Sequence, residues 1–134
     1  MRKLLTPIFV LFFTFGCASA DLLREAETPE QKYWAALSIF DTYDEAALGL
    51  AQDPATPVSA QQILKKSRGV AKAALVLADE GYNAVQAARM QLDLMPDATN
   101  LDALTVAVQV FNGRAENAFV KVRSFRDTVD DFQE

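Results

Sequence analysis

The sequence predicts an all-α fold, an antiparallel up-down-up bundle of three helices. Apolar residues recur at steps of three and four along most of residues 29–133, which is the spacing of one helix face. Only two short proline-containing stretches, 53–57 and 95–99, interrupt this pattern, and no segment alternates as a strand does. Short loops between long amphipathic helices favour antiparallel neighbours.

The first predicted helix runs from Pro29 to about Gln52. Thr28 supplies an N-cap, Pro29 suits the first helical position, and Gln31 completes a capping box. The stretch 53–57 contains Pro54 and Pro57, and it ends the helix. The apolar face consists of Tyr33, Ala36, Leu37, Phe40, Tyr43, Ala47 and Leu50.

The second predicted helix begins at Pro57 or Ser59 and continues to about Met95, with Ser59 and Gln62 read as a second capping box. Its apolar face is wide and rich in alanine, as expected of a helix that touches two neighbours. Gly81 lies inside it and could mark a break, which would give four helices instead of three. The face comprises Ile63, Leu64, Val70, Ala71, Ala74, Leu75, Leu77, Ala78, Tyr82, Val85, Ala88 and Leu92.

The third predicted helix follows a cap at Asp97 or Thr99 and has the most regular pattern in the chain. Its apolar positions alternate steps of three and four over more than four heptads. They are Leu101, Leu104, Val108, Phe111, Ala115, Ala118, Val122, Phe125, Val129 and Phe132.

The first twenty residues are predicted to be a bacterial secretion signal rather than part of the fold. Arg2 and Lys3 provide the positive region, and Leu4 to Phe15 is an apolar stretch of about a dozen residues. A membrane-spanning helix needs about 20 residues, so a retained anchor is the weaker alternative. The expected layout is therefore a signal over 1–20, a linker over 21–28 and a helical domain over 29–134.

Two cleavage sites compete at the end of this signal. Ala18-Ser19-Ala20 would leave Asp21 at the mature N-terminus, whereas Gly16-Cys17-Ala18 resembles the end of a bacterial lipoprotein signal. The resemblance, which extends to the Ala-rich helical body of many small lipoproteins, implies that Cys17 carries acyl chains such as palmitate. It implies a membrane anchor on the periplasmic side of the envelope. Ala18 in place of an aspartate implies the outer membrane.

The composition argues against most catalytic and nucleic-acid-binding functions. The chain has no histidine, and Cys17 is its single cysteine, so the commonest general base and most zinc, haem and thiol chemistry are missing. Without Arg2 and Lys3 the net charge falls from −5 to about −7, which repels phosphate backbones. We expect no enzyme, no cofactor, no metal and no nucleic-acid partner.

The unequal helix lengths predict an interaction surface. The first helix is about 20 Å shorter than the other two at 1.5 Å per residue, so the hairpin between the longer helices is poorly covered. Either the segment Leu22-Leu23-Ala26 folds over this end, or its apolar residues form a patch for a partner or for self-association. The residues concerned are Leu92, Leu94, Met95, Leu101, Leu104 and Val106.

A basic stripe on the second helix is the other candidate surface. Lys65, Arg68 and Lys72 are spaced by three and four residues. They could meet anionic headgroups or an acidic partner, or pair with acids on a neighbouring helix. Acidic residues cluster at Asp41 to Glu45 and at the C-terminus, where a loose site for a divalent cation is the alternative to a solvated surface.

The function that these observations favour is an envelope-anchored helical interaction or structural module. A periplasmic bundle that binds a small apolar ligand, or that acts as a holding chaperone, is the alternative. The helical stress chaperones of the periplasm carry a Leu-Thr-x-x-Gln motif, and here Leu104-Thr105 is followed by a glutamine one place late, at Gln109.

Overall fold

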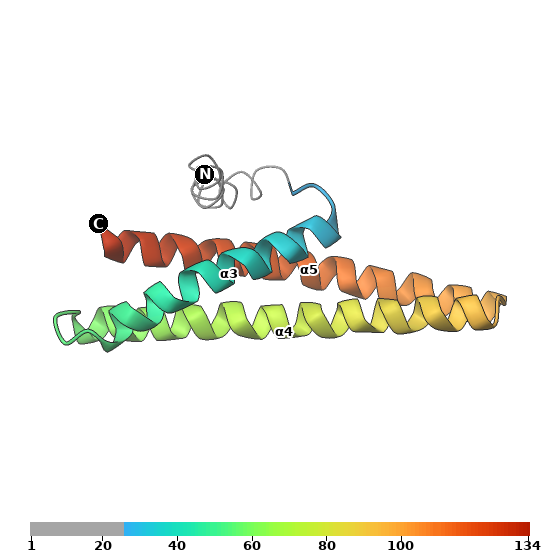
Figure 1. The fold of residues 1–134 in the computed structure, drawn as a ribbon, viewed down its shortest axis with the longest axis horizontal. Helices are drawn as coiled ribbons and strands as arrows, with labels where there is room; N and C mark the ends of the chain where they lie inside the picture. The colour runs from blue at the N-terminus through green and yellow to red at the C-terminus, as the bar shows by residue number, and fades with distance from the viewer. Residues whose placement is uncertain (1–25) are drawn as a thin grey trace, which may run out of the picture.

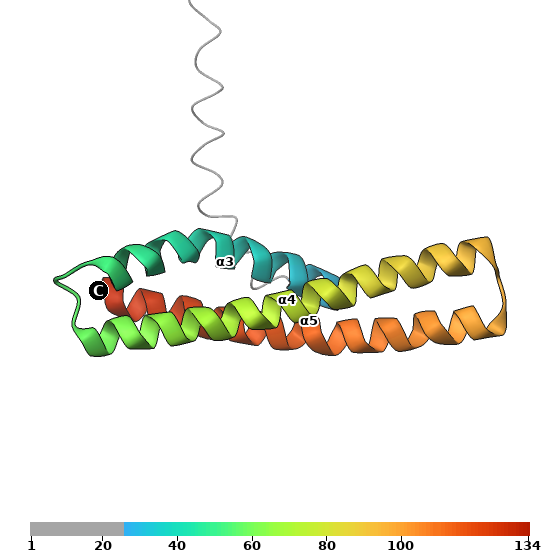
Figure 2. The same ribbon diagram turned by 90° about the horizontal axis from the view of Figure 1, so that it is seen from below.

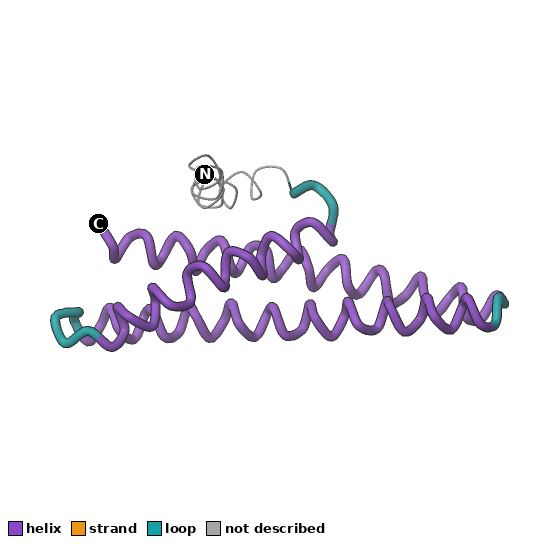
Figure 3. The backbone as a smooth tube through the Cα atoms, viewed as in Figure 1, coloured by secondary structure: helices purple, strands orange, loops and turns teal. Residues whose placement is uncertain are grey.

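The computed structural model describes residues 26–134, and these residues form three helices and no strand (Figures 1 and 3). The helices are α3 (Pro29–Gln52), α4 (Val58–Leu94) and α5 (Ala98–Gln133). Each helix contacts the other two. Figure 1 shows α5 returning alongside α4, with α3 lying against both. The predicted all-α class is confirmed.

The helix starts are fixed by local hydrogen bonds. The Gln31 amide donates to Thr28 Oγ1 at 3.2 Å, and the Thr28 amide donates to Gln31 Oε1 at 3.1 Å, so the predicted capping box is present. At α5 the Asn100 amide donates to Asp97 Oδ1 at 2.7 Å. Both interactions satisfy amides that the first helical turn leaves without partners.

The second predicted capping box is wrong. Pro57 occupies the N-cap position of α4, no side chain caps it, and Ser59 lies within the first turn. Gln61 instead reaches back to the loop, where its Nε2 donates to the carbonyls of Asp53 at 3.1 Å and Thr56 at 3.0 Å. The α4 start is thus stabilised by a side chain that bonds to the loop and not by a reciprocal box.

The alternative of four helices is also wrong, because α4 is continuous through Gly81. A Cβ atom built on Gly81 would lie 3.2 Å from Phe111 Cα and 3.4 Å from Arg114 Cδ. That is closer than most side chains tolerate, so this glycine allows α4 and α5 to approach each other. Its role is helix packing and not a break.

The core is built from alanines and a few large side chains from all three helices. The largest fully buried side chains are Tyr33, Ile39, Leu64, Val122, Phe125 and Val129. Some residues predicted for the apolar faces are exposed, namely Ile63, Val70, Leu77, Leu101 and Phe132. The prediction fails at these positions because the apolar faces are wider than the surfaces that neighbouring helices cover.

The predicted mismatch in helix length is present: α3 has 24 residues, whereas α4 has 37 and α5 has 36. Figures 1 and 2 show the α4–α5 hairpin extending beyond the start of α3. The last buried residue of α4 is Val85 and the first of α5 is Phe111. Ala26 packs partly buried against the core, while Leu22 and Leu23 lie outside the described residues.

Candidate functional site

The tip of the α4–α5 hairpin carries most of the predicted interaction residues on its surface. Leu94 is 80% exposed, and Met95, Leu101 and Val106 are also exposed. Leu92 and Leu104 are half-buried, so they contribute less to the surface. Two further exposed side chains at this end, Met90 and Val110, were not predicted from the sequence. We define the tip patch as Met90, Leu94, Met95, Leu101, Val106 and Val110.

The spacing of the two missed residues explains how the tip patch is arranged. Met90 lies four residues before Leu94 on α4, and Val110 lies four residues after Val106 on α5. Residues four apart share a helix face, so each helix presents an aliphatic pair to solvent. A search for i, i+4 partners of Leu94 and Val106 would have found both residues in the sequence.

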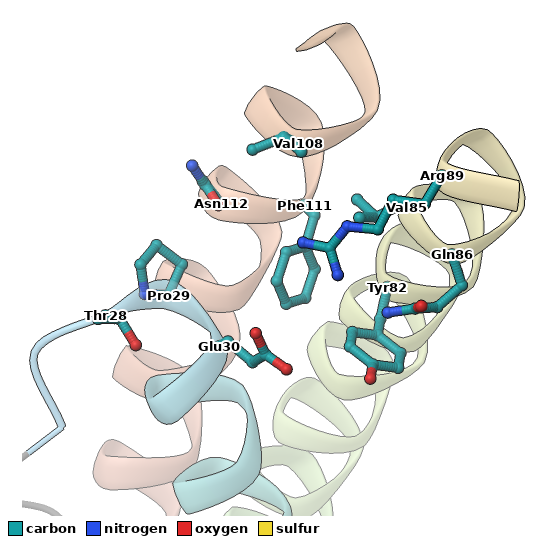
Figure 4. Close-up of a pocket in the computed structure, with 10 residues that line it drawn as sticks. All are labelled: Thr28, Pro29, Glu30, Tyr82, Val85, Gln86, Arg89, Val108, Phe111 and Asn112. Atoms are coloured by element: carbon teal, nitrogen blue, oxygen red, sulfur yellow. The ribbon is translucent and has the colours of Figure 1, made fainter. Parts of the chain in front are cut away.

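A pocket lies where α3 begins, next to the uncovered hairpin (Figure 4). Its volume is about 260 Å³, and Tyr82, Val85, Val108 and Phe111 form its apolar part. The remaining lining consists of Thr28, Pro29, Glu30, Gln86, Arg89 and Asn112. All three helices contribute to the lining, which places the pocket between the start of α3 and the α4–α5 hairpin.

The charged groups of this pocket are of opposite sign. Figure 4 shows the Arg89 guanidinium beside the Phe111 ring, on the α4 side, and the Glu30 carboxylate below the ring, next to α3. Neither forms an ion pair within 4.0 Å among residues 26–134. An apolar group that carries one polar end therefore fits the chemistry of the lining better than a purely ionic ligand.

An aromatic cluster supports the pocket from the core side. The rings of Tyr33 and Tyr82 lie 5.5 Å apart, and both lie 5.7 Å from the ring of Phe111. Tyr33 is buried, and its hydroxyl donates to Asp79 Oδ1 at 2.8 Å. Burial is the main cause that raises the pKa of Tyr33, and the hydrogen bond to Asp79 raises it further. Trp34, 49% exposed, packs on Tyr33 and Tyr82 at the edge of the cluster.

In the basic stripe, Arg68 forms an ion pair between two helices, whereas Lys65 and Lys72 form none among residues 26–134. The Arg68 guanidinium binds both carboxylate oxygens of Asp44 on α3, with Nη2 and Oδ2 at 3.1 Å. This hydrogen bonding raises the pKa of Arg68. Lys65 and Lys72 are exposed and have no ion-pair partner among residues 26–134. Arg68 thus joins α3 to α4 and does not extend the lysine surface.

The acidic clusters are not assembled as a cation site in the part of the chain that the structure describes. Asp44 is engaged by Arg68, and Asp130 accepts a hydrogen bond from the Tyr43 hydroxyl at 3.5 Å. Across residues 26–134, no three histidine, cysteine or acidic residues gather in a metal-binding arrangement.

The predicted lipid attachment residue, Cys17, lies outside the described residues. Within residues 26–134, no helix combines the length and the apolar character needed to cross a membrane. Comparison with family models, with curated proteins and with solved structures gives no match to this chain.

Proposed function

We propose that this protein is an envelope-anchored helical interaction module without catalytic chemistry. In this proposal an acyl-modified Cys17 holds an antiparallel up-down-up bundle at the periplasmic face of the outer membrane. The Gly16-Cys17-Ala18 sequence supports the anchor, and the lack of histidine in the whole chain supports a non-catalytic role.

The tip patch is the observation that carries the proposal. A helix stripe of apolar residues is stable when another element covers it, and within residues 26–134 no residue of α4 after Val85 and none of α5 before Phe111 is buried. Large apolar side chains concentrated at one end of a domain mark a binding surface. The tip patch would therefore contact an envelope protein or a second copy of the chain.

Photo-crosslinking in intact cells tests this interaction. A crosslinking amino acid replaces Leu94 in the tip patch, and a matched variant replaces Val58, which is 68% exposed at the opposite end of α4. We expect a discrete adduct from position 94 and none from position 58. An adduct of twice the chain mass indicates self-association. Equal adducts from both positions, or none from either, would contradict the proposal.

The pocket at the start of α3 favours a second candidate, the binding of a small apolar ligand. Its apolar part is formed by Tyr82, Val85, Val108 and Phe111. We expect fatty acids to raise the melting temperature of the protein, and Val108→Glu to abolish that rise. A holding chaperone instead predicts that the protein suppresses aggregation of an unfolded client and that Leu94→Gln weakens this suppression.

A further inference from the structure

A second apolar surface runs along α4, away from the tip patch. Ile63, Val70 and Leu77 are 51%, 44% and 45% exposed, although their spacing places them on the wide apolar face of the helix. Residues seven apart return to nearly the same face, so the three side chains form a stripe about 21 Å long. Large aliphatic residues at strict heptad spacing are typical of a helix-packing surface.

The stripe faces away from α3. Arg68 and Asp79 are the α4 residues that bond to α3, through Asp44 and Tyr33. Val70 and Leu77 each lie two residues from one of them, which is about 160° around the helix at 3.6 residues per turn. Helix α3 therefore covers the opposite side of α4 and leaves this stripe open.

Part of the stripe lines a groove between α4 and α5 of about 340 Å³. Ile63 and Val70 contribute the apolar lining, together with Lys66, Ser67, Lys121 and Ser124. Ser67 Oγ lies 3.5 Å from Thr128 Oγ1, which brings the two helices together beside the groove. Small side chains at Ser67 and Ser124 allow a third backbone to approach closely.

The two lysines give the groove a positive charge that the described part of the chain does not neutralise. Lys66 and Lys121 are exposed, and neither has an ion-pair partner among residues 26–134. One turn beyond Leu77, by contrast, Arg114 Nη1 lies 3.8 Å from Glu80 Oε2. In a protein with a net charge of −5, uncompensated lysines beside an exposed aliphatic stripe select an acidic partner.

We propose that this groove binds an amphipathic helix of a partner protein whose apolar stripe is flanked by acidic residues. The heptad spacing of Ile63, Val70 and Leu77 matches the packing of a helix at a shallow crossing angle. Carboxylates beside the partner's apolar stripe pair with Lys66 and Lys121. A partner helix can present an apolar stripe of the same heptad spacing with carboxylates on its flanks, whereas a lipid bilayer has no stripe that matches Ile63 and Val70.

Two synthetic 18-residue helical peptides with identical leucine heptads test the proposal, one flanked by glutamates and the other by lysines. Fluorescence anisotropy measures the binding of each peptide to the full chain. We expect the glutamate peptide to bind at least about tenfold more tightly, and the double variant Lys66→Glu, Lys121→Glu to reverse this preference. Val70→Glu should abolish binding of both peptides.

Val76→Glu provides the matched control, because Val76 is also on α4, is 50% exposed and does not line the groove. It should leave binding unchanged, and circular dichroism melting shows whether each variant is folded. Equal binding of the two peptides, no binding of either, or an equal loss with Val76→Glu overturns the proposal.

If the groove instead binds a second copy of the chain or a lipid surface, other measurements show it, and either result would overturn the proposal. A concentration-dependent dimer in sedimentation that Val70→Glu disrupts assigns the groove to a second copy. Binding to anionic vesicles that Lys66→Glu removes assigns it to lipid. The groove and the tip patch share no residue, so failure of crosslinking at Leu94 does not affect this test.

Discussion

The close approach of α4 and α5 at Gly81 makes opposite predictions for two glycines in the same helix. Replacing an exposed helical glycine with alanine stabilises a protein by about 1 kcal/mol. Gly69 is exposed and a Cβ there meets nothing within 4 Å, so Gly69→Ala should give this gain. For a domain of this size the melting temperature should rise by roughly 4 °C.

Gly81→Ala gains the same helix propensity but places its Cβ 3.2 Å from Phe111 Cα. The Arg114 side chain, 3.4 Å away, can rotate, whereas the backbone at Phe111 moves only if the helices separate. Overpacking of this kind costs about 1–3 kcal/mol. The net change should therefore lie between about zero and 2 kcal/mol of destabilisation.

Urea denaturation followed by circular dichroism measures both variants against the parent chain. The expected free energy of unfolding of Gly69→Ala exceeds that of Gly81→Ala by about 1–3 kcal/mol, with unchanged dependence on urea. If Gly81→Ala stabilises the protein as much as Gly69→Ala does, α4 and α5 are not in close contact here and the reasoning is refuted.

Three further predictions concern the caps, the ion pair and the buried tyrosine. Thr28→Ala should lower the free energy of unfolding by about 1 kcal/mol, because Thr28 caps α3. Ser59→Ala should change it by less than about 0.5 kcal/mol, because Ser59 does not cap α4. Equal effects of the two substitutions in urea denaturation would mean that Ser59 caps α4 after all. A double-mutant cycle of Asp44→Asn and Arg68→Gln should give a coupling of about 0.5–1 kcal/mol, which 1 M salt should reduce; no coupling would mean that the pair contributes nothing. The unfolded state loses the tyrosine proton from about pH 10, whereas burial and Asp79 raise the pKa of Tyr33 in the folded state, so stability should fall as pH rises above about 10; an equal fall in a Tyr33→Phe variant, measured by urea denaturation, would contradict this.

The helices were predictable because their signals are local. Thr28, Pro29 and Gln31 define the start of α3 through a capping box that depends on neighbouring residues alone, and the observed bounds of α3 match the prediction. The second box failed because Ser59 competes with Pro57, and a proline at the cap position starts the helix before the serine is reached.

The exposed surfaces were only partly predictable, because they depend on which neighbour covers a face. The length difference between the helices indicated the hairpin tip in advance. The pattern of Ile63, Val70 and Leu77, however, is the same whether another helix covers these residues or solvent does. Sequence alone assigned them to the core, and only the position of α3 on the opposite side of α4 shows that they line an open surface.

The role of Gly81 shows the same limit. A glycine within a helical pattern is compatible with a break and with a close helix crossing, and the two differ in what lies opposite the glycine. The α5 residue that faces it, Phe111, lies thirty positions away in the sequence. No local signal connects the two residues.

The anchor on Cys17 is the central claim of the proposed function, and the intact mass of the protein tests it most directly. The protein is extracted from membranes with detergent and its N-terminus is identified by mass spectrometry. The proposal predicts a chain that begins at Cys17 and carries two or three acyl groups. An unmodified chain that begins at Asp21, recovered without detergent, would contradict the anchor and favour a free periplasmic bundle.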